Sequence, residues 1–335
     1  MTDRILLDHG SGGKMAHQLM TGLLLPLFDN PLLAMMHDGA VFDVAEGRLA
    51  FSTDTFVVDP IFFPGGDIGD LAVNGTVNDV AMCGAVPLYL SMGLIVEEGL
   101  AMIDLKRVLI SARSAMDRAG VQLITGDTKV VPRGAVDKIF INTSGIGVVA
   151  PGVRIGGDGA RAGDRIILSG TMADHGIAVL TQREGLRFES DIQSDTAPLN
   201  AMVQAILAAA PAVRVLRDPT RGGVGTALNE IALKSRVGMI IEEARLPVAP
   251  AVAGACELLG FDPLYLANEG KLLCCVSDDK ADAVLSAIRQ SPFGRAATII
   301  GRVVADHPGK VVMTTGIGGQ RIVDMLAGEQ LPRIC

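Results

Sequence analysis

Short apolar runs, broken at intervals by polar residues, mark the first half of the chain and are typical of β-strands. Such runs are RLAFSTD at 48–54, YLSMGLIV at 89–96 and KIFINTSGIGVV at 138–149. Residues 104–120 instead place apolar side chains at the spacing of a helix and end in Gly120, a common helix stop. The pattern therefore predicts a mixed α and β structure for this half.

A polar, glycine-rich passage at 151–164 separates this half from a second series of apolar segments. The second series consists of predicted strands at 165–170, 271–277 and 295–304 and predicted helices at 198–210 and 223–235. From about Gly328 the pattern fades. We expect an α/β (α+β) fold with domains at 1–150 and 151–327, followed by a flexible tail at 328–335.

Composition supports a globular protein that does not bind nucleic acid or membranes. The chain has 335 residues, 49% of them hydrophobic, and a net charge of −8 without a basic run that could follow a phosphate backbone. Its longest uncharged stretch, Val80–Val96, is interrupted by glycine and proline, and the N-terminus lacks the pattern of a secretory signal. Five cysteines without C-x-x-C spacing favour a reducing compartment, so we expect a cytoplasmic protein.

Two glycine-rich stretches have the composition of anion-binding loops. DHGSGGK at 8–14 precedes a helical pattern, and the backbone N–H groups of such a loop can surround a phosphate, although a flexible entry loop is the alternative. It is not a Walker A sequence. IGGDGARAG at 155–163 precedes a strand instead of following one, so it does not fit a dinucleotide-binding fingerprint.

Several aspartates lie at the edges of apolar segments, where they serve either as turn and cap residues or as ligands of a cation. The aspartates in question are Asp38, Asp43, Asp54, Asp79 and Asp127. If they converge, their hard oxygen atoms suit Mg²⁺, which in turn carries nucleotide phosphates. The segment 217–230 adds Asp218, Thr220 and Arg221 before a glycine pair that opens a helix, again a suitable place for a phosphate.

The chain ends in LPRIC, with a cysteine as its final residue. Terminal residues are usually mobile and seldom have a packing role, so an inert Cys335 is the default expectation. Cys83, Cys274 and Cys275 lie in apolar surroundings, and we expect them to be buried without a chemical role.

An ordered set of motifs resembles the HypE family of hydrogenase maturation factors, within the PurM-like ATP-binding superfamily typified by aminoimidazole ribonucleotide synthetase. The motifs are HGSGGK, STDTFVVDPIFFPGGDIG, AVNGTVNDVAMCGAVP, TGDTKVV, DPTRGGVGTALNE and the terminal PRIC. The resemblance covers essentially the whole chain, and the terminal cysteine motif is its most specific part.

This resemblance implies a fold, a reaction and partners. Two α/β domains are implied, of which the N-terminal one forms a homodimer and completes an ATP site near the interface. The terminal cysteine would receive a carbamoyl group from the carbamoyltransferase HypF. ATP would then drive dehydration of that group to a thiocyanate, and the cyanide would pass to iron on the HypC–HypD complex.

The resemblance and the required chemistry also suggest roles for individual residues. The implied magnesium ligands are Asp38, Asp54, Asp79 and Asp127. The implied ATP-binding residues are Ser11, Gly12, Gly13, Lys14, Asp54, Asn78, Thr128, Asp218 and Arg221. For catalysis we nominate Cys335 as carrier, Glu269 as general base and Lys129 as the cation that stabilises the transferred phosphoryl group.

Alternatives to these roles stay open at this point. Glu269 and Lys129 are equally consistent with surface ion pairs, and His9, His17 and His175 are candidates for proton transfer by residue type alone. Other PurM-like enzymes, among them purine-synthesis ligases, selenophosphate synthetases and thiamine phosphate kinases, use ATP on the same scaffold, but none of them explains a terminal cysteine. A protein of another class, an ATP-gated docking module whose tail anchors a partner, is the remaining alternative.

Overall fold

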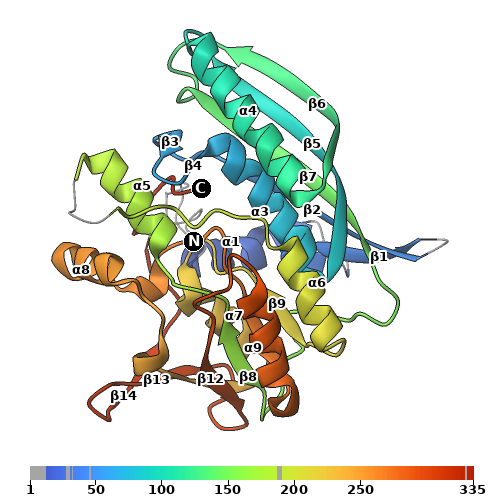
Figure 1. Ribbon diagram of the computed structural model, residues 1–335, viewed down its shortest axis with the longest axis vertical. Coiled ribbons are helices and arrows are strands. Elements are labelled where there is room, and N and C mark those ends of the chain that lie inside the picture. Colours follow the sequence, from blue (N-terminus) through green and yellow to red (C-terminus); the bar gives the residue numbers. More distant parts are fainter. Residues whose placement is uncertain (1–12, 28–30, 32, 45–46, 187–190, 329) are drawn as a thin grey trace.

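The computed structural model describes residues 13–27, 31, 33–44, 47–186, 191–328 and 330–335 of the chain. Two α/β units, each built around one sheet, follow one another along the sequence and occupy the upper and lower parts of the view in Figure 1. The sheets fall on either side of residue 150. The division into domains at that residue stays a prediction.

The first sheet contains five strands in the order β1-β2-β7-β5-β6. The strands are β1 (Ala40–Val44), β2 (Gly47–Phe56), β5 (Ala85–Glu97), β6 (Gln122–Val131) and β7 (Ile139–Val149). Neighbours pair antiparallel except β5 and β6, which run parallel. The three strands predicted from the apolar runs of this half are thus confirmed as β2, β5 and β7.

Two helices cover one face of this sheet. α3 (Ile68–Met82) begins at Asp67, whose side chain accepts hydrogen bonds from the backbone N–H groups of Gly69 and Asp70. α3 is buried on nearly all sides because it lies between the sheet and α4 (Met102–Ala119). α4 ends at Gly120, whose φ of +71° suits a residue without a Cβ atom, as the sequence predicts.

The opposite face of the first sheet is exposed and carries several large apolar side chains. On β2, β5 and β7 these are the exposed side chains of Phe51, Val86, Tyr89, Ile95 and Val148. Exposed apolar side chains gathered on one sheet face often mark a surface that another protein covers.

The second sheet contains seven strands in the order β14-β13-β10-β12-β8-β11-β9. The strands are β8 (Arg165–Leu168), β9 (Val215–Arg217), β10 (Gly238–Glu242), β11 (Leu273–Val276), β12 (Thr298–Val304), β13 (Val311–Thr314) and β14 (Gln320–Val323). All neighbours pair antiparallel except β10 and β13. β8, β11 and β12 confirm the strands predicted in this half.

Helices pack on both faces of the second sheet. α6 (Asn200–Ala209) and α9 (Ala281–Gln290) share one apolar cluster with the sheet, while α7 (Gly223–Ser235) shares another. Because side chains of a strand alternate between faces, Cys274 lies in the first cluster and Cys275 in the second. α5 (Asp174–Glu184) packs against α8 (Pro250–Leu259).

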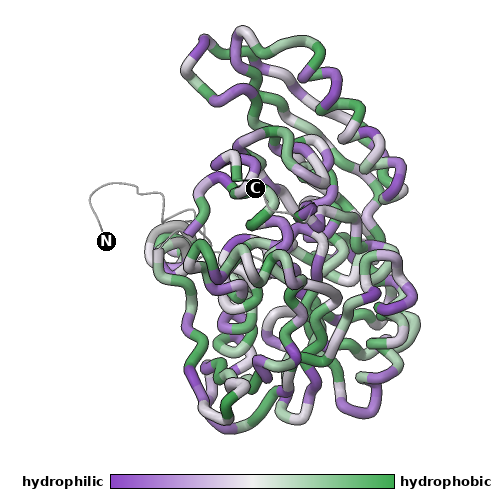
Figure 2. Tube along the Cα trace, turned by 60° about the vertical axis from the view of Figure 1, so that its left-hand side comes forward, coloured by the Kyte–Doolittle hydropathy of each residue, from purple (hydrophilic) through white to green (hydrophobic). Residues whose placement is uncertain are grey.

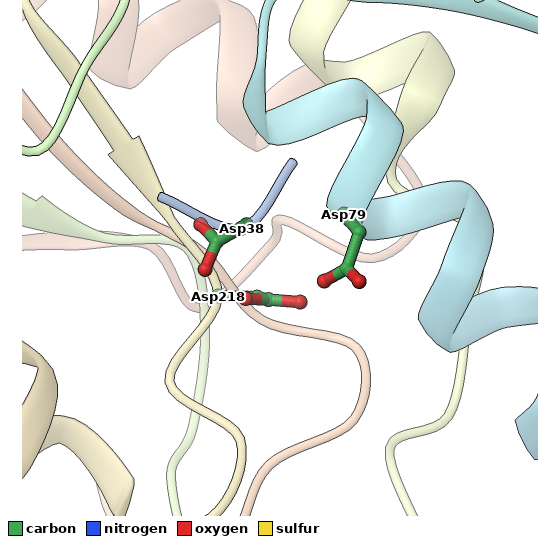
Figure 3. A group of neighbouring side chains, drawn as sticks. All are labelled: Asp38, Asp79 and Asp218. Atoms are coloured by element: carbon green, nitrogen blue, oxygen red, sulfur yellow. The ribbon is translucent and has the colours of Figure 1, made fainter. Parts of the chain in front are cut away.

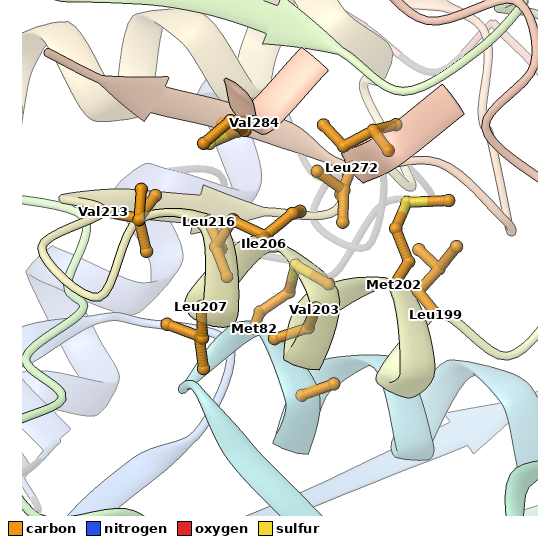
Figure 4. Close-up of a cluster of buried hydrophobic side chains, with 14 of the residues drawn as sticks. Met82, Leu199, Met202, Val203, Ile206, Leu207, Val213, Leu216, Leu272 and Val284 are labelled. Carbon is orange, nitrogen blue, oxygen red and sulfur yellow. The ribbon is translucent and has the colours of Figure 1, made fainter. Parts of the chain in front are cut away.

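One apolar core joins the two halves of the chain. Val80 and Met82, at the end of α3, lie in the same buried cluster as Met202, Val203 and Ile206 of α6, and Figure 4 shows Met82 beside the α6 side chains. This cluster extends to β9 and β11. The end of α3 is therefore held in a fixed position relative to the second sheet.

The remaining elements are short. They are α1 (Lys14–Leu19), η2 (Met20–Leu24), α2 (Leu25–Leu27), η3 (Leu33–Met35), β3 (Phe62–Phe63), β4 (Gly66–Asp67), η4 (Glu243–Arg245), η5 (Pro263–Tyr265) and η6 (Asp278–Lys280). Hydrophobic and hydrophilic residues are interspersed along the trace in Figure 2. Within the described residues, none of the helices combines the length and the apolar character that crossing a membrane requires.

Candidate active site

Three aspartates from distant parts of the sequence meet between the two sheets. Asp38 precedes β1, Asp79 belongs to the last turn of α3, and Asp218 follows β9. One carboxylate oxygen of each lies within 4.8 Å of the others, and Figure 3 shows the three side chains gathered in one place. We call this group the acidic cluster.

Burial raises the pKa of all three carboxyl groups, and the negative charges of nearby acids add to this. The pKa of Asp79 is raised well above its ordinary value by burial and then by the charges of Asp218, Asp54 and Asp38. Burial raises the pKa of Asp38 to about 6 although the neighbouring Arg217 opposes this. The acidic cluster is consequently costly to ionise in the isolated chain, and a bound cation would offset that cost.

Neighbouring polar groups hold the acidic cluster in place. Arg217 lies between two carboxylates, with Nη1 2.5 Å from Asp38 and Nη2 2.7 Å from Glu230. The hydroxyl group of Ser52 donates to Asp79 over 2.7 Å. Oδ2 of Asp38 is buried and has no hydrogen-bond partner among the described residues, so it is available to a cation.

Sequence reasoning did not single out Arg217 or Ser52 as site residues. Both lie in motifs in which a neighbouring aspartate was the candidate residue: Ser52 is two residues before Asp54, and Arg217 directly precedes Asp218. An arginine directly before an aspartate at the end of a predicted apolar segment was the available signal. It became meaningful only when the structure brought Asp38 to Arg217.

Asp54, Arg221 and Glu269 border the acidic cluster. Burial raises the pKa of Asp54, and the positive charge of Arg221 opposes this. Glu269 is 3% exposed, and its Oε1 has no hydrogen-bond partner among the described residues. Its pKa is raised well above the ordinary value by burial and then by the charges of Asp195, Asp54 and Asp218. Glu269 is thus a buried acid that faces the cluster, not half of a surface ion pair.

The structure does not bring Asp127, Thr128 and Lys129 to this place within one chain. They lie on the exposed edge strand β6, where Lys129 pairs with Asp127 over 2.7 Å. Across the ladder, Asp127 is opposite Gly93, Gly93 is opposite Asn142, and Asn142 is opposite Thr55, the neighbour of Asp54. Three strand spacings of about 4.8 Å therefore separate Asp127 from the strand of Asp54, roughly 14 Å.

Asn78 occupies a structural position in this chain. Its side-chain amide donates to the backbone carbonyls of Ala197 and Glu269 and accepts from the N–H group of Leu199 over 2.8 Å. These bonds join α3 to the second half of the chain and use both amide N–H donors of Asn78. Asn78 therefore helps to hold the frame of the site, and its role in nucleotide binding stays a prediction.

Part of the predicted phosphate loop lies within the described residues. Ser11 and Gly12 fall outside them, whereas Lys14 begins α1 and Gly13 directly precedes it. The N–H group of Lys14 donates to the carbonyl of Leu326 over 2.8 Å, and a Cβ atom on Gly13 would lie 2.4 Å from that same oxygen. Glycine at this position therefore allows the loop to contact the segment that leads into the tail.

The tail predicted to be flexible is docked in this structure. Cys335 is 8% exposed and belongs to an apolar cluster with Phe56 and Ala267. Arg221, Ala267 and Ile334 line one small cavity of about 20 Å³. The end of the chain thus lies beside Arg221 and the segment that bears Glu269, and Figure 1 places it between α5 and the β3–β4 pair.

Comparisons with known proteins agree with this arrangement. The family described as AIR synthase related protein, N-terminal domain, matches residues 36–149, and its C-terminal domain counterpart matches residues 161–314. A relative from Cupriavidus necator named Carbamoyl dehydratase HypE is 54% identical over 99% of this chain and 95% of its own length. The chain belongs to the HypE family.

Solved HypE structures share the fold. The HypE chain of a HypE–HypF complex superposes with a TM-score of 0.88 at 46% identity, covering 92% of this chain and 99% of that one. A HypE in complex with ATP superposes with a TM-score of 0.84 at 52% identity, covering 99% of this chain and 100% of that one. Both the family and the two-domain PurM-like fold predicted from the motifs are confirmed.

Proposed function

We propose that this HypE-family chain is an ATP-dependent carbamoyl dehydratase that converts a carbamoyl group on Cys335 to a thiocyanate. The product supplies the cyanide ligands of the iron in [NiFe]-hydrogenases. One observation supports this above the others: the residue before Cys335 lines a cavity together with Arg221, next to the buried Glu269 and the acidic cluster. The carrier atom and a candidate nucleotide site therefore adjoin within one chain.

The chemistry has two steps whose atoms balance. Transfer of the γ-phosphoryl group of ATP to the amide oxygen of the thiocarbamate releases ADP and one N–H proton. Loss of the second N–H proton and departure of phosphate then leave a carbon–nitrogen triple bond on the sulfur of Cys335. The oxygen atom removed leaves with the phosphate, so the net change in the tail is the loss of one water.

Glu269 is the proposed general base for these proton transfers. Its unpartnered Oε1 is directed into a buried environment, and its raised pKa gives the ionised form more basicity than an exposed glutamate has. The nearby positive charge of Arg221 favours the ionised form. Arg221 is also suited to the developing negative charge of the transferred phosphoryl group.

The acidic cluster is the proposed magnesium site. Asp38, Asp79 and Asp218 offer hard oxygen ligands within reach of one ion, one of them unpartnered and all with raised pKa, and Asp54 borders them. Magnesium bound there would neutralise the charge of the nucleotide phosphates. With the nucleotide in place, Gly13 and Lys14 are suited to close over its phosphates.

A homodimer explains the exposed apolar face of the first sheet and the position of Asp127. Two copies that pack these faces together bury the side chains of Phe51, Tyr89 and Ile95. Since Asp127, Thr128 and Lys129 lie on the same exposed strand, a dimer is the arrangement in which they serve the site of the other copy. Thr128 then belongs to nucleotide binding and Lys129 to phosphoryl transfer.

Partners follow from the carrier role of Cys335. We propose that the carbamoyltransferase HypF loads the tail, in keeping with the HypE–HypF complex known for a relative, and that the HypC–HypD complex accepts the cyanide. All of these steps take place in the cytoplasm.

The decisive experiment follows the mass of the tail. Incubation with the carbamoyltransferase, carbamoyl phosphate and ATP should add a carbamoyl group to Cys335 and then remove one water, whereas Cys335→Ala should acquire neither change and still bind ATP. Peptide mapping identifies the modified residue. An adduct on Cys83 or Cys256 in the parent would overturn the proposal, and ATP consumption that is independent of the carbamoylated tail would instead favour a gated docking module.

A further inference from the structure

The last residues of the chain lie against the segment that follows β2. The N–H group of Val57 donates to a terminal carboxylate oxygen of Cys335 over 2.9 Å, and that of Asp59 donates to the carbonyl of Arg333 over 3.2 Å. The main chain of the tail is therefore tied at alternate residues to the segment 57–59.

Helix α5 supplies two side chains that grip the main chain of the tail. Arg183 donates from Nη1 to the carbonyl of Pro332 and from Nη2 to that of Arg333, each over 2.7 Å. Its Nε donates to the carbonyl of Asp59 over 2.8 Å. One guanidinium thus joins the tail to the segment on which the tail lies.

His175 completes the contact at the next residue of the tail. Its Nε2 lies 2.7 Å from the carbonyl of Ile334, and because a carbonyl only accepts, Nε2 must hold the proton. Nδ1 then accepts from the hydroxyl of Ser194 over 2.8 Å, while that oxygen accepts from the N–H group of Thr196. Burial lowers the pKa of His175, in agreement with this neutral tautomer.

The docked tail is inaccessible to another enzyme. Ile334 is 4% exposed and Cys335 is 8% exposed, and both pack with Phe56 and Ala267. A partner that must place its own active site around the sulfur of Cys335 cannot do so in this state. Loading of the tail and chemistry at the buried site therefore require two positions of the same segment.

We propose that α5 and residues 57–59 form a binding site for the main chain of the tail, in which Arg183 and His175 are positioning residues. The inference rests on the proposed carrier role of Cys335. The hydrogen bonds from α5 engage the carbonyls of Pro332, Arg333 and Ile334, which do not change when the sulfur is modified. The same site therefore holds the thiol, the thiocarbamate and the thiocyanate alike.

Such a site has opposite effects on the two half-reactions. Weakening it frees the tail, so loading by the carbamoyltransferase becomes faster. The same change takes the loaded sulfur away from Glu269 and Arg221, so dehydration becomes slower. A general loss of stability would slow both half-reactions.

The first test measures how well docking protects Cys335, without any ATP chemistry. Arg183→Ala removes two hydrogen bonds to the tail, each worth a factor of about 2 to 10, so alkylation of Cys335 by iodoacetamide should accelerate about 5- to 100-fold. Arg183→Lys keeps a cation with a single donor group and should give an intermediate rate. Arg245→Ala, which removes an exposed arginine paired with Glu242 in the second half of the chain, is the matched control.

The second test separates the half-reactions in the same variants. Tails are carbamoylated with the carbamoyltransferase, and the loading rate is recorded; loaded protein is then given ATP and magnesium in a single turnover. Arg183→Ala should load faster and dehydrate more slowly than the parent, with Arg183→Lys in between and Arg245→Ala unchanged. A parent that fails to dehydrate its tail would refute the proposed function, while the alkylation result would still judge the binding site.

Two outcomes would overturn the inference. One is an alkylation rate in Arg183→Ala equal to that of the parent. The other is equal acceleration in Arg183→Ala and Arg245→Ala, which would indicate general loosening of the fold. If Arg183→Ala fails to fold, Arg183→Lys and His175→Gln decide the question, since each keeps a donor at its position and should raise the alkylation rate measurably.

Discussion

The acidic cluster and the docked tail lie close together but are built in opposite ways. The cluster consists of side chains from both halves of the chain, fixed by an apolar core that includes the end of α3, α6 and β9. The tail is held by a handful of hydrogen bonds, chiefly to its backbone, and by two terminal apolar residues. The difference separates a permanent feature of the fold from a reversible one.

The free energies that hold the two regions explain why only the tail is released. Each hydrogen bond that holds the tail contributes about 0.5–1.5 kcal/mol, because water competes for the same groups once the tail is released. Separating the end of α3 from α6 would instead expose several large apolar side chains, each at a cost of about 1.5–3 kcal/mol. The tail is therefore the more easily released of the two regions, whereas the acidic cluster stays assembled.

The largest expected effect is at Glu269, on the permanent side of this comparison. Glu269→Gln keeps the shape of the side chain but loses its basic oxygen, so dehydration of the preloaded tail should slow by roughly 10²- to 10⁴-fold. In the parent, the rate should rise with pH, because Glu269 has a raised pKa and acts as a base only after losing its proton. Single-turnover measurements between pH 5 and 9, read by the mass of the tail, check both statements.

The same variant separates the role of the general base from the binding of the tail. Glu269→Gln should leave loading and alkylation of Cys335 at the parent rate, and its residual dehydration should lose the pH dependence. Dehydration at the parent rate in Glu269→Gln would remove Glu269 from the mechanism and turn attention to Lys129 of a second copy.

At Asp79 we expect a smaller loss of activity, without a loss of stability. Asp79→Asn removes one charge from the acidic cluster while Asn can still accept from Ser52, so magnesium-dependent ATP hydrolysis should fall by at least about tenfold. The raised pKa of Asp79 means that ionising it in the folded chain costs stability at neutral pH, and that cost disappears as the pH falls toward its unfolded value near 4. Without magnesium, Asp79→Asn should therefore melt at the parent temperature or above it at pH 7.5.

Asp117→Asn is the matched control for this prediction, since Asp117 is an exposed partner of Arg113 on α4. It should change neither hydrolysis nor the melting temperature by a measurable amount. Unchanged hydrolysis together with a lowered melting temperature in Asp79→Asn would show that Asp79 only stabilises the end of its helix.

The smallest expected effect is at Arg333, on the reversible side. Its Nη1 lies 2.6 Å from Asp137 and its Nε donates to the carbonyl of Val57, but the ion pair is partly exposed. Arg333→Ala should therefore raise the alkylation rate of Cys335 by only about two- to tenfold, less than Arg183→Ala. A larger effect than that of Arg183→Ala would show that side-chain contacts of the tail, not its backbone, dominate docking.

Local patterns predicted much of the fold because short-range rules govern it. Apolar alternation located β2 and β7, and Gly120 stopped α4 where its left-handed backbone requires glycine. α5 was missed because residues 175–181 are buried on every side, which leaves no polar face to reveal a helical period. Strand order in the first sheet has no local signal either, so the sequence could not place Asp127 at the edge, away from Asp54.

The candidate site was predictable where side-chain chemistry defines it. The motifs pointed to Asp38, Asp79 and Asp218, and the structure brings these three together; their roles as metal or phosphate ligands stay predictions. Sequence alone could not show that the amide of Asn78 makes internal hydrogen bonds, and its role toward the nucleotide stays a prediction. The hydrogen bonds from Arg183 to the tail could not be predicted from the sequence, because they end on backbone carbonyls, which every residue has.

The shared core between α3 and α6 also limits how this protein can move. Many two-domain enzymes admit and release substrates by a hinge that opens the space between the domains. Here such a hinge would have to pull Val80 and Met82 away from Met202 and Ile206, and so tear open a continuous interior. The moving part is therefore the end of the chain, which carries the substrate into and out of the site, while the two halves of the body stay fixed relative to one another.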